Sequence, residues 1–208
     1  MRIGSDYGGW IVPRNLIGPK SICYCAGVGE DISFDLGLIE QFGCHVFAFD
    51  PTPRAKIHIV KTAVGVKQYY FFDYGVWGYD EEVRFFAPRD PSHVSHSALN
   101  LQKTERYFDA RCKRLSTIMQ ENGHDHIDLL KLDIEGAEYA VLRSILEDHL
   151  QVGIICVEYD EVHNAIDDRY IHRIRRSIRE LRKAGYVIVA KDEQQNYTLV
   201  RRDKICEG

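Results

Sequence analysis

Acidic side chains follow two apolar stretches in the second half of the chain. Asp133 and Glu135 come directly after one stretch, and Glu158 follows the next. Asp160 and His163 lie shortly beyond Glu158. Carboxylates and imidazoles can take a proton from a hydroxyl group, and they can also bind a divalent metal ion. These residues indicate proton transfer or metal-assisted chemistry, provided that the fold brings them together.

A pair of glycines follows an apolar stretch near the N-terminus. Gly27 and Gly29 stand directly after the stretch 21–26, and Asp50 lies 21 residues past Gly29, where the next stretch ends. Glycines at such a turn let a ligand approach the backbone, and a carboxylate at this spacing can accept hydrogen bonds from ribose hydroxyls. We therefore expect a nucleoside site made by Ala26, Gly27, Gly29, Glu30 and Asp50.

The charge of this turn bears on the kind of nucleoside that it can bind. The third glycine of the dinucleotide fingerprint is missing, and Glu30 and Asp31 place negative charge where a pyrophosphate would have to lie. S-adenosylmethionine has no phosphate and carries an ammonium and a sulfonium, so acidic neighbours suit it. The pattern favours this methyl donor, and a nicotinamide or flavin oxidoreductase is the alternative.

The elements that must position these residues alternate between strands and helices. Repeated strand–helix units predict an α/β fold with a doubly wound, mostly parallel sheet, and the last two strands predict a C-terminal antiparallel hairpin. In such sheets, ligands bind beyond the carboxyl ends of the strands. The apolar periodicity predicts strands at 21–26, 45–49, 69–72, 127–132, 152–157, 186–190 and 197–201, and helices at 31–42, 53–62, 138–150 and 171–184.

Residues 75–104 interrupt this alternation, and we expect them to form an insertion that lines the substrate site. Gly78-Tyr79-Asp80 separates two aromatic-rich runs, which predicts a hairpin over 75–87 followed by a loop. Charged and apolar residues alternate over 108–113, which is typical of an edge strand. Ser116 is then predicted to cap a short helix.

Further residues can complete the crevice. Trp77 follows the third expected strand and is predicted to wall an adenine pocket, or else to pack within the hairpin. Ser95, His96 and Ser97 can form a lid over the substrate, or else a plain polar loop. In the N-terminal arm, residues 1–20, the segment Tyr7-Gly8-Gly9-Trp10 is expected to fold over the same crevice.

The most distinctive string in the chain is IDLLKLDIEGAE at 127–138, which resembles the signature of the FkbM family of methyltransferases. GVGEDISFD at 27–35 and DPTP at 50–53 are similar to that family's cofactor loop and acidic strand end. The resemblance extends from about Tyr7 to the last strand. It implies a Rossmann-like class I methyltransferase fold and methyl transfer from S-adenosylmethionine, usually to a hydroxyl group of a sugar, glycan or natural product.

One departure from the family pattern adds another alternative. Cys23 and Cys25 stand where the family usually has an acid and a glycine leading into its loop. A catalytically inactive, methyltransferase-like binding module would fit this difference.

Three interpretations of the acidic strand ends stay open. In the first, Asp133 or Glu135 is the general base, Lys131 orients or neutralises it, and Asp133 also contacts the cofactor. In the second, a divalent ion such as Mg²⁺ acidifies the acceptor hydroxyl. Its ligands would be Asp133 and Glu158, with Asp160 or His163. In the third, Glu135 and Glu138 only stabilise the start of the next helix through its dipole.

Composition limits the class of protein. The 208 residues, 45% hydrophobic and 28% charged, suit a single globular methyltransferase domain over 1–208. A net charge of −4 gives no overall positive field, so we expect neither nucleic acid nor membrane as a partner. The family resemblance implies a small-molecule or glycan acceptor. The N-terminus lacks the apolar core of a signal peptide, which predicts a cytoplasmic protein. The sequence does not indicate an oligomeric state.

The cysteines show no metal-binding spacing. Six are present, with neither a CxxC pair nor a pattern typical of structural zinc. Because most of them fall in or beside apolar stretches, we expect buried, reduced thiols.

Overall fold

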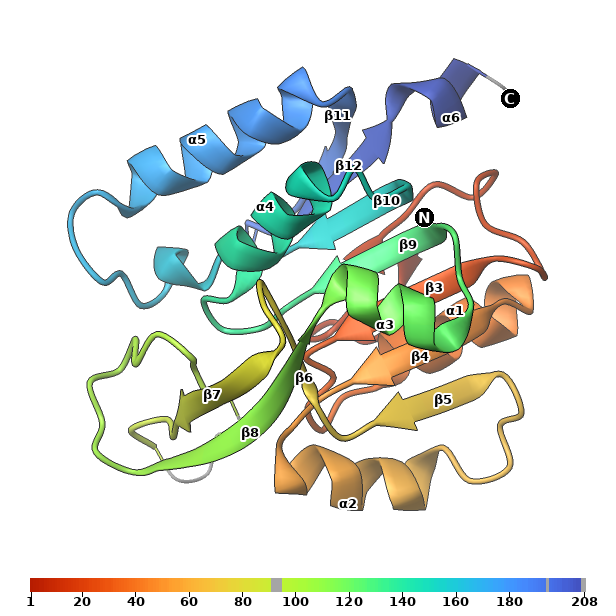
Figure 1. The fold of residues 1–208 in the computed structure, drawn as a ribbon. Coiled ribbons are helices and arrows are strands. Elements are labelled where there is room, and N and C mark those ends of the chain that lie inside the picture. The colour runs from red at the N-terminus through yellow and green to blue at the C-terminus, as the bar shows by residue number, and fades with distance from the viewer. Residues whose placement is uncertain (91–94, 194, 207–208) are drawn as a thin grey trace.

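The computed structural model describes residues 1–90, 95–193 and 195–206, and a seven-stranded sheet forms its centre (Figure 1). The strand order is β11-β12-β10-β9-β3-β4-β5. All neighbouring strands from β10 to β5 are parallel, and β12 runs antiparallel to both β10 and β11. The predicted doubly wound sheet with a C-terminal antiparallel hairpin is therefore confirmed. The strands are β3 (Ile22–Ala26), β4 (His45–Phe49), β5 (Tyr69–Phe72), β9 (Ile127–Leu132), β10 (Val152–Val157), β11 (Tyr186–Lys191) and β12 (Tyr197–Arg201).

Helices cover both faces of this sheet (Figure 1). Successive strand residues point to opposite faces, so Leu130 packs with α3, α4 and α5, whereas Leu129 packs with α1 and α2. Both leucines are fully buried, as expected for a parallel strand covered on its two sides. The helices are α1 (Ser33–Phe42), α2 (Pro53–Thr62), α3 (Leu115–Asn122), α4 (Glu138–Glu147), α5 (Tyr170–Lys183) and α6 (Arg202–Cys206), with a 3₁₀ turn at Asp160–Val162.

The N-terminal arm is part of the core. Its strands β1 (Arg2–Ile3) and β2 (Trp10–Ile11) pair with each other. Trp10 is 2% exposed and packs against Phe34 of α1 with 6.4 Å between ring centroids. Thr198 Oγ1 donates a 2.6 Å hydrogen bond to the Ile11 carbonyl oxygen. These contacts fix the turn between β1 and β2 close to the ends of the sheet strands.

The insertion after β5 differs from the prediction. Strands β6 (Gly75–Trp77) and β7 (Glu81–Phe86) do not pair with each other, because β8 (Tyr107–Arg114) lies between them in a three-stranded sheet. The predicted hairpin over 75–87 and the predicted edge strand over 108–113 are both wrong. Alternation of charged and apolar residues indicates that the two faces of a strand have different surroundings. It does not indicate whether the strand has one neighbouring strand or two. Residues 91–94 of the predicted loop lie outside the described residues.

Two smaller predictions can also be compared with the structure. Ser116 does not cap α3, which begins at Leu115, and the Ser116 hydroxyl donates to Asp148 instead. Five cysteines are buried and unpaired, as predicted for reduced thiols: Cys23, Cys25, Cys44, Cys112 and Cys156.

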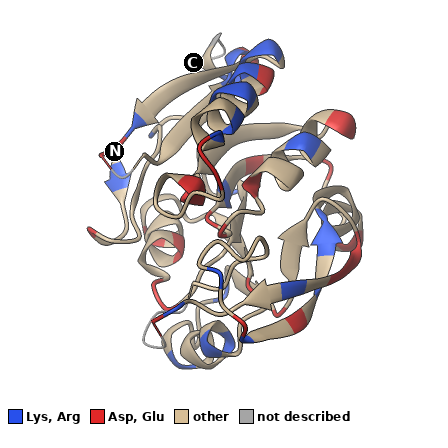
Figure 2. Cartoon of the chain, turned by 90° about the vertical axis from the view of Figure 1, so that its left-hand side faces the viewer, with Lys and Arg blue, Asp and Glu red and all other residues tan. Residues whose placement is uncertain are grey.

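Two chain-wide features complete the fold. Lys, Arg, Asp and Glu positions are interspersed over the elements in Figure 2. Within the described part of the chain, no helix is long and apolar enough to cross a membrane.

Candidate active site

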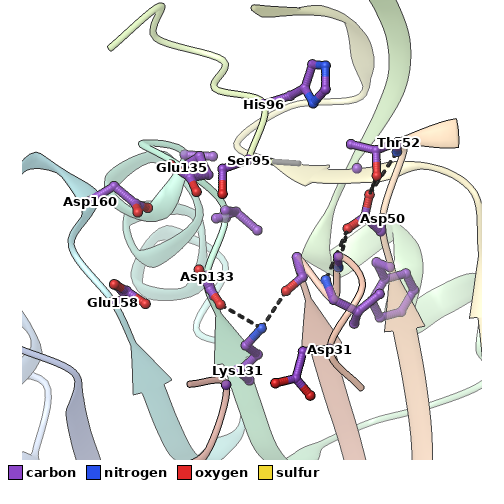
Figure 3. A pocket seen from close by; sticks show the side chains of 18 of the residues that line it. Asp31, Asp50, Thr52, Ser95, His96, Lys131, Asp133, Glu135, Glu158 and Asp160 are labelled. Atoms are coloured by element: carbon purple, nitrogen blue, oxygen red, sulfur yellow. Dashed lines mark hydrogen bonds and ion pairs between the residues drawn. The ribbon is translucent and has the colours of Figure 1, made fainter. Parts of the chain in front are cut away.

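A cavity of about 470 Å³ opens at the carboxyl ends of the central strands. Its position beside β3 and β9 is the switch point of the sheet, where connections leave in opposite directions. In Figure 3, Glu135, Glu158 and Asp160 lie on one side of it and Asp50 and Thr52 on the other. The predicted residues that line it are Tyr7, Gly8, Gly27, Gly29, Glu30, Asp50, Ser95, His96, Lys131, Asp133, Glu135, Glu158, Asp160 and His163.

Asp50 holds the glycine loop rather than presenting a free carboxylate. Its Oδ2 accepts hydrogen bonds from the amides of Val28 (3.1 Å) and Gly29 (2.9 Å). Its Oδ1 accepts from the Thr52 amide (2.8 Å) and the Thr52 hydroxyl (2.6 Å). A carboxylate offers about four lone-pair sites, and these four donors use them. Asp50 thus acts as a clamp between the loop and the start of α2, and its contact with a ribose stays a prediction.

The same bonds bear on the choice of cofactor. Because the Val28 and Gly29 amides point at Asp50, they are not directed at a pyrophosphate. Glu30 pairs with Arg54 at 2.7 Å, and Asp31 accepts a 2.9 Å hydrogen bond from the Ser33 amide at the start of α1. The loop keeps its acidic character toward the cavity, which disfavours a dinucleotide.

Lys131 joins this loop to the end of β9. Its side chain is 6% exposed, and its ammonium donates to the Gly27 carbonyl oxygen and lies 2.9 Å from Asp133 Oδ2. A β-carbon at position 27, where φ is +74°, would overlap the Asp133 carbonyl oxygen. Glycine is therefore required by the close approach of the two strand ends. The arrangement makes Lys131 the counter-ion that holds Asp133 in place.

Glu135 has a strained backbone at the rim of the cavity. It adopts φ +53°, a left-handed conformation that costs a side-chain-bearing residue about 1 kcal/mol or more. Ser97 Oγ donates a 2.6 Å hydrogen bond to the Glu135 carbonyl oxygen, and the Ser95 side chain hydrogen-bonds to the carboxyl group. Burial raises the pKa of this carboxyl. Strain kept at such a position is a common sign of function.

Three more carboxyl groups lie near Glu135, those of Glu138, Glu158 and Asp160. Glu138 is fully buried and accepts hydrogen bonds from the amides of Ile134 and Gly136, and burial raises its pKa to about 7. Burial also raises the pKa of Glu158 to about 8 and that of Asp160 well above its usual value. Desolvation penalises the charged form of each, and the neighbouring acids add to the effect.

We predict that Glu138 makes the fold less stable as the pH rises. At pH values between 4.5, the ordinary pKa of a glutamate, and about 7, the raised pKa of Glu138, the unfolded chain releases the carboxyl proton while the folded chain retains it. The unfolded state then binds fewer protons, so the free energy of unfolding falls across this window, by roughly 3 kcal/mol at most. Thermal unfolding of the wild type and of Glu138→Gln at several pH values measures this pH dependence of stability. The same pH dependence in both proteins would contradict the prediction. Glu82→Gln, which changes an exposed glutamate in a strand, is the matched control.

Some predicted site residues lie outside the cavity. Ala26 is fully buried, and its carbonyl oxygen accepts from the Asp133 amide. Trp77 points away, because its indole Nε1 donates a 2.8 Å hydrogen bond to Glu81, the first residue of β7. Val76 and Phe85 line the cavity instead. Trp10 is in the core, as described above. In each case the backbone position was near the site, but the side chain faces elsewhere.

The predicted metal ligands line the same cavity, but their side chains are not arranged as a metal site among the described residues. Asp133 is turned toward Lys131, and His163 Nε2 lies 3.5 Å from Glu158 Oε1 with its side chain half exposed. Over 1–90, 95–193 and 195–206, no group of three or more His, Cys, Asp or Glu is arranged to hold a metal ion. The arrangement therefore gives no support to the metal interpretation.

The structure adds residues that the sequence reading missed. Thr52 completes the Asp50 clamp. Asp35, on α1, is 2% exposed and lies under the cavity, where the Tyr69 hydroxyl donates to it at 3.1 Å and burial raises its pKa to about 6. Its signal in the sequence was an acid beside the apolar stripe that carries Phe34 and Leu38.

Comparison with known proteins identifies the family of this chain. The model of the methyltransferase FkbM domain matches residues 26–188. Probable methyltransferase-like protein 24 from Rattus norvegicus is 33% identical over 138 residues, and its Homo sapiens counterpart is 32% identical over the same length. Each match covers 65% of this chain and 31% of the relative, so the chain spans about a third of the length of these two proteins.

A solved structure shows the same architecture. The fibrillarin pre-rRNA processing protein of Methanococcus jannaschii superposes with a TM-score of 0.51, at 10% identity, over 93% of this chain and 70% of that one. At this identity the likeness concerns the fold alone, which is the predicted Rossmann-like class I methyltransferase fold. Together with the domain match over most of the sequence, it leads to one conclusion: the chain belongs to the FkbM methyltransferase family.

Proposed function

We propose that this protein transfers a methyl group from S-adenosylmethionine to a hydroxyl group of a sugar, glycan or other natural product. The observation that carries the proposal is a single cavity that joins the glycine loop after β3 to the acidic ends of β9 and β10. Membership of the family supports methyl transfer. The acceptor class is the one that the family resemblance implies.

The side chains around the loop fit this cofactor. Glu30 and Asp31 suit a cationic ligand, while Val76 and Phe85 offer apolar surface for an adenine ring. When bound, S-adenosylmethionine supplies an activated methyl group on a positively charged sulfur. Asp133, held by Lys131 next to the loop, is placed to balance positive charge at that end of the cavity.

Glu135 is the general base of this proposal. Its carboxylate takes the hydroxyl proton as the bond from oxygen to the methyl group forms and the bond from sulfur to that group breaks. The sulfur keeps the electron pair and leaves as S-adenosylhomocysteine. A base with a raised pKa is better matched to a hydroxyl proton near neutral pH than an ordinary carboxylate. Ser95 and Ser97 hold Glu135 in position, which supports alignment of the two reactants.

Calorimetric titration of the full chain tests the proposal. S-adenosylmethionine and S-adenosylhomocysteine are expected to bind with a stoichiometry of about one, and NADH is not expected to bind. A screen of hydroxylated acceptors for S-adenosylhomocysteine production then follows. Binding of NADH alone would indicate an oxidoreductase, and binding of none of the three would indicate an inactive module.

A further inference from the structure

We propose that Tyr7 binds the acceptor, and that a sugar ring stacks on its aromatic side chain at the mouth of the cavity, with the hydroxyl group to be methylated directed at Glu135. This inference rests on the proposed function and deepens it, because it assigns a residue to the acceptor and selects a ring-shaped one. The residues already assigned to the cofactor and to the base come from other segments of the chain.

Tyr7 lies at the mouth of the cavity. It belongs to the turn between β1 and β2, it lines the cavity, and its side chain is 79% exposed. Partial burial of its hydroxyl, together with the negative charges of Asp133, Glu135 and Glu158, raises the pKa of this group. The hydroxyl is therefore within electrostatic reach of the acidic strand ends, whereas the ring is open to solvent. A ligand placed at the base would have this ring as a neighbour.

Hydrogen bonds to the start of α1 fix the turn that carries Tyr7. Ser5 Oγ donates to Asp31 Oδ2 at 2.5 Å, and it accepts from the Gly8 amide at 2.8 Å. The Ser5 amide donates to Ser33 Oγ at 2.7 Å. These bonds hold the chain on both sides of Tyr7, so the turn presents this residue in one place. Ser5 is thus a positioning residue for Tyr7.

A tyrosine that is held in this way suits a sugar ring. Its side chain has two rotatable bonds, so a contact with a ligand costs little conformational entropy. The two faces of a pyranose carry C–H groups that pack against an aromatic ring, while its hydroxyl groups point outward from the rim. An acyclic polyol has similar hydroxyl groups but no flat apolar face. The ring should therefore distinguish cyclic from acyclic acceptors.

Polar side chains in the same cavity suit the hydroxyl groups of such a ring. Ser95, Gln102 and Asn164 all line the cavity. Ser95 lies beside the carboxyl group of Glu135 (Figure 3). Gln102 Oε1 accepts a 2.8 Å hydrogen bond from the Arg89 amide, which orients its side-chain amide. Hydroxyl and amide groups can both donate and accept hydrogen bonds, as recognition of a hydroxylated ligand requires.

Pairs of cyclic and acyclic polyols test the inference. The methyl pyranosides of glucose, galactose and mannose are compared with glucitol, galactitol and mannitol. Binding to the full chain loaded with S-adenosylhomocysteine is measured by saturation-transfer NMR. We expect at least one pyranoside to bind roughly tenfold more tightly than its acyclic partner. Tyr7→Ala should remove this preference, whereas Tyr7→Phe, which keeps the ring, should retain most of it.

A double variant tests the role of the turn. Ser5→Ala should weaken binding of the pyranoside, because Tyr7 loses its fixed position. If Ser5 acts through Tyr7, the double variant Ser5→Ala/Tyr7→Ala should bind the pyranoside no more weakly than Tyr7→Ala alone. Additive losses would overturn the positioning role of Ser5. Thermal unfolding of each variant checks that the fold is retained.

The remaining outcomes separate the inference from the proposed function. Tyr79→Ala changes an exposed tyrosine beside Arg114 and should leave all affinities unchanged. Unchanged pyranoside affinity in Tyr7→Ala, equal binding within every pair, or no binding of any pyranoside would overturn the inference. A large loss of S-adenosylhomocysteine affinity in Tyr7→Ala would also overturn it, because Tyr7 would then belong to the cofactor site. Failure of the wild type to bind S-adenosylhomocysteine would instead remove the proposed function, and the inference with it.

Discussion

Replacing Glu135 by glutamine is expected to lower kcat by roughly a hundredfold to ten-thousandfold while affinity for S-adenosylhomocysteine stays within a few-fold. The amide cannot take up the hydroxyl proton. It has nearly the same shape as the carboxyl group and can accept the hydrogen bond from Ser95. The left-handed backbone and the bond from Ser97 to the carbonyl oxygen do not depend on the side-chain charge. The loss should therefore fall on the chemical step.

Single-turnover kinetics with an acceptor identified by the screen measure this effect. Because the base must be deprotonated, kcat/KM of the wild type should fall on acidification through the raised pKa of Glu135, and this limb should be absent from the Glu135→Gln profile. Glu82→Gln serves as the control for loss of a surface charge. An unchanged kcat in Glu135→Gln, with a large loss in Asp133→Asn, would transfer the role of base to Asp133.

Replacing Asp50 by alanine should destabilise the fold and weaken cofactor binding together. The change removes the acceptor of four hydrogen bonds and leaves the Val28 and Gly29 amides without their partner. We expect a loss of roughly 2 to 4 kcal/mol in the free energy of unfolding. The glycine loop would then have no fixed conformation, so affinity for S-adenosylhomocysteine should fall at least about tenfold. Denaturant unfolding and calorimetry measure the two quantities.

A second ligand separates the clamp from direct contact with ribose. If Asp50 acts only through the loop, Asp50→Ala should lose the same factor of affinity for S-adenosylhomocysteine and for its 2′-deoxy analogue. A loss confined to the ligand with the hydroxyl would show that Asp50 binds ribose. Asp73→Asn provides the control, because it removes an exposed carboxylate that pairs with Lys56 and should leave both quantities nearly unchanged.

The core of the fold could be predicted from the sequence because its signals are local. The strands 45–49, 69–72, 127–132 and 152–157 have the predicted limits. Each is a short apolar run bounded by turn residues, and burial on both faces of a parallel sheet produces that pattern. The insertion was less predictable. The pairing of β6 and β7 with β8 instead of with each other joins residues 21 to 37 positions apart, which no local pattern encodes.

The candidate site also has features that the sequence predicts and features that depend on the tertiary structure. The sequence by itself determined which loops face the cavity, since glycines and acids at the ends of parallel strands must meet at one edge of the sheet. Only the tertiary structure decided what the side chains do there. It turned Trp77 outward to Glu81, directed four donors of the protein at Asp50, and buried Asp160 against the carboxyl groups of Glu135 and Glu138. Spacing along the chain fixes where a residue's backbone lies, whereas its hydrogen bonds and charge state depend on neighbours that only folding brings close.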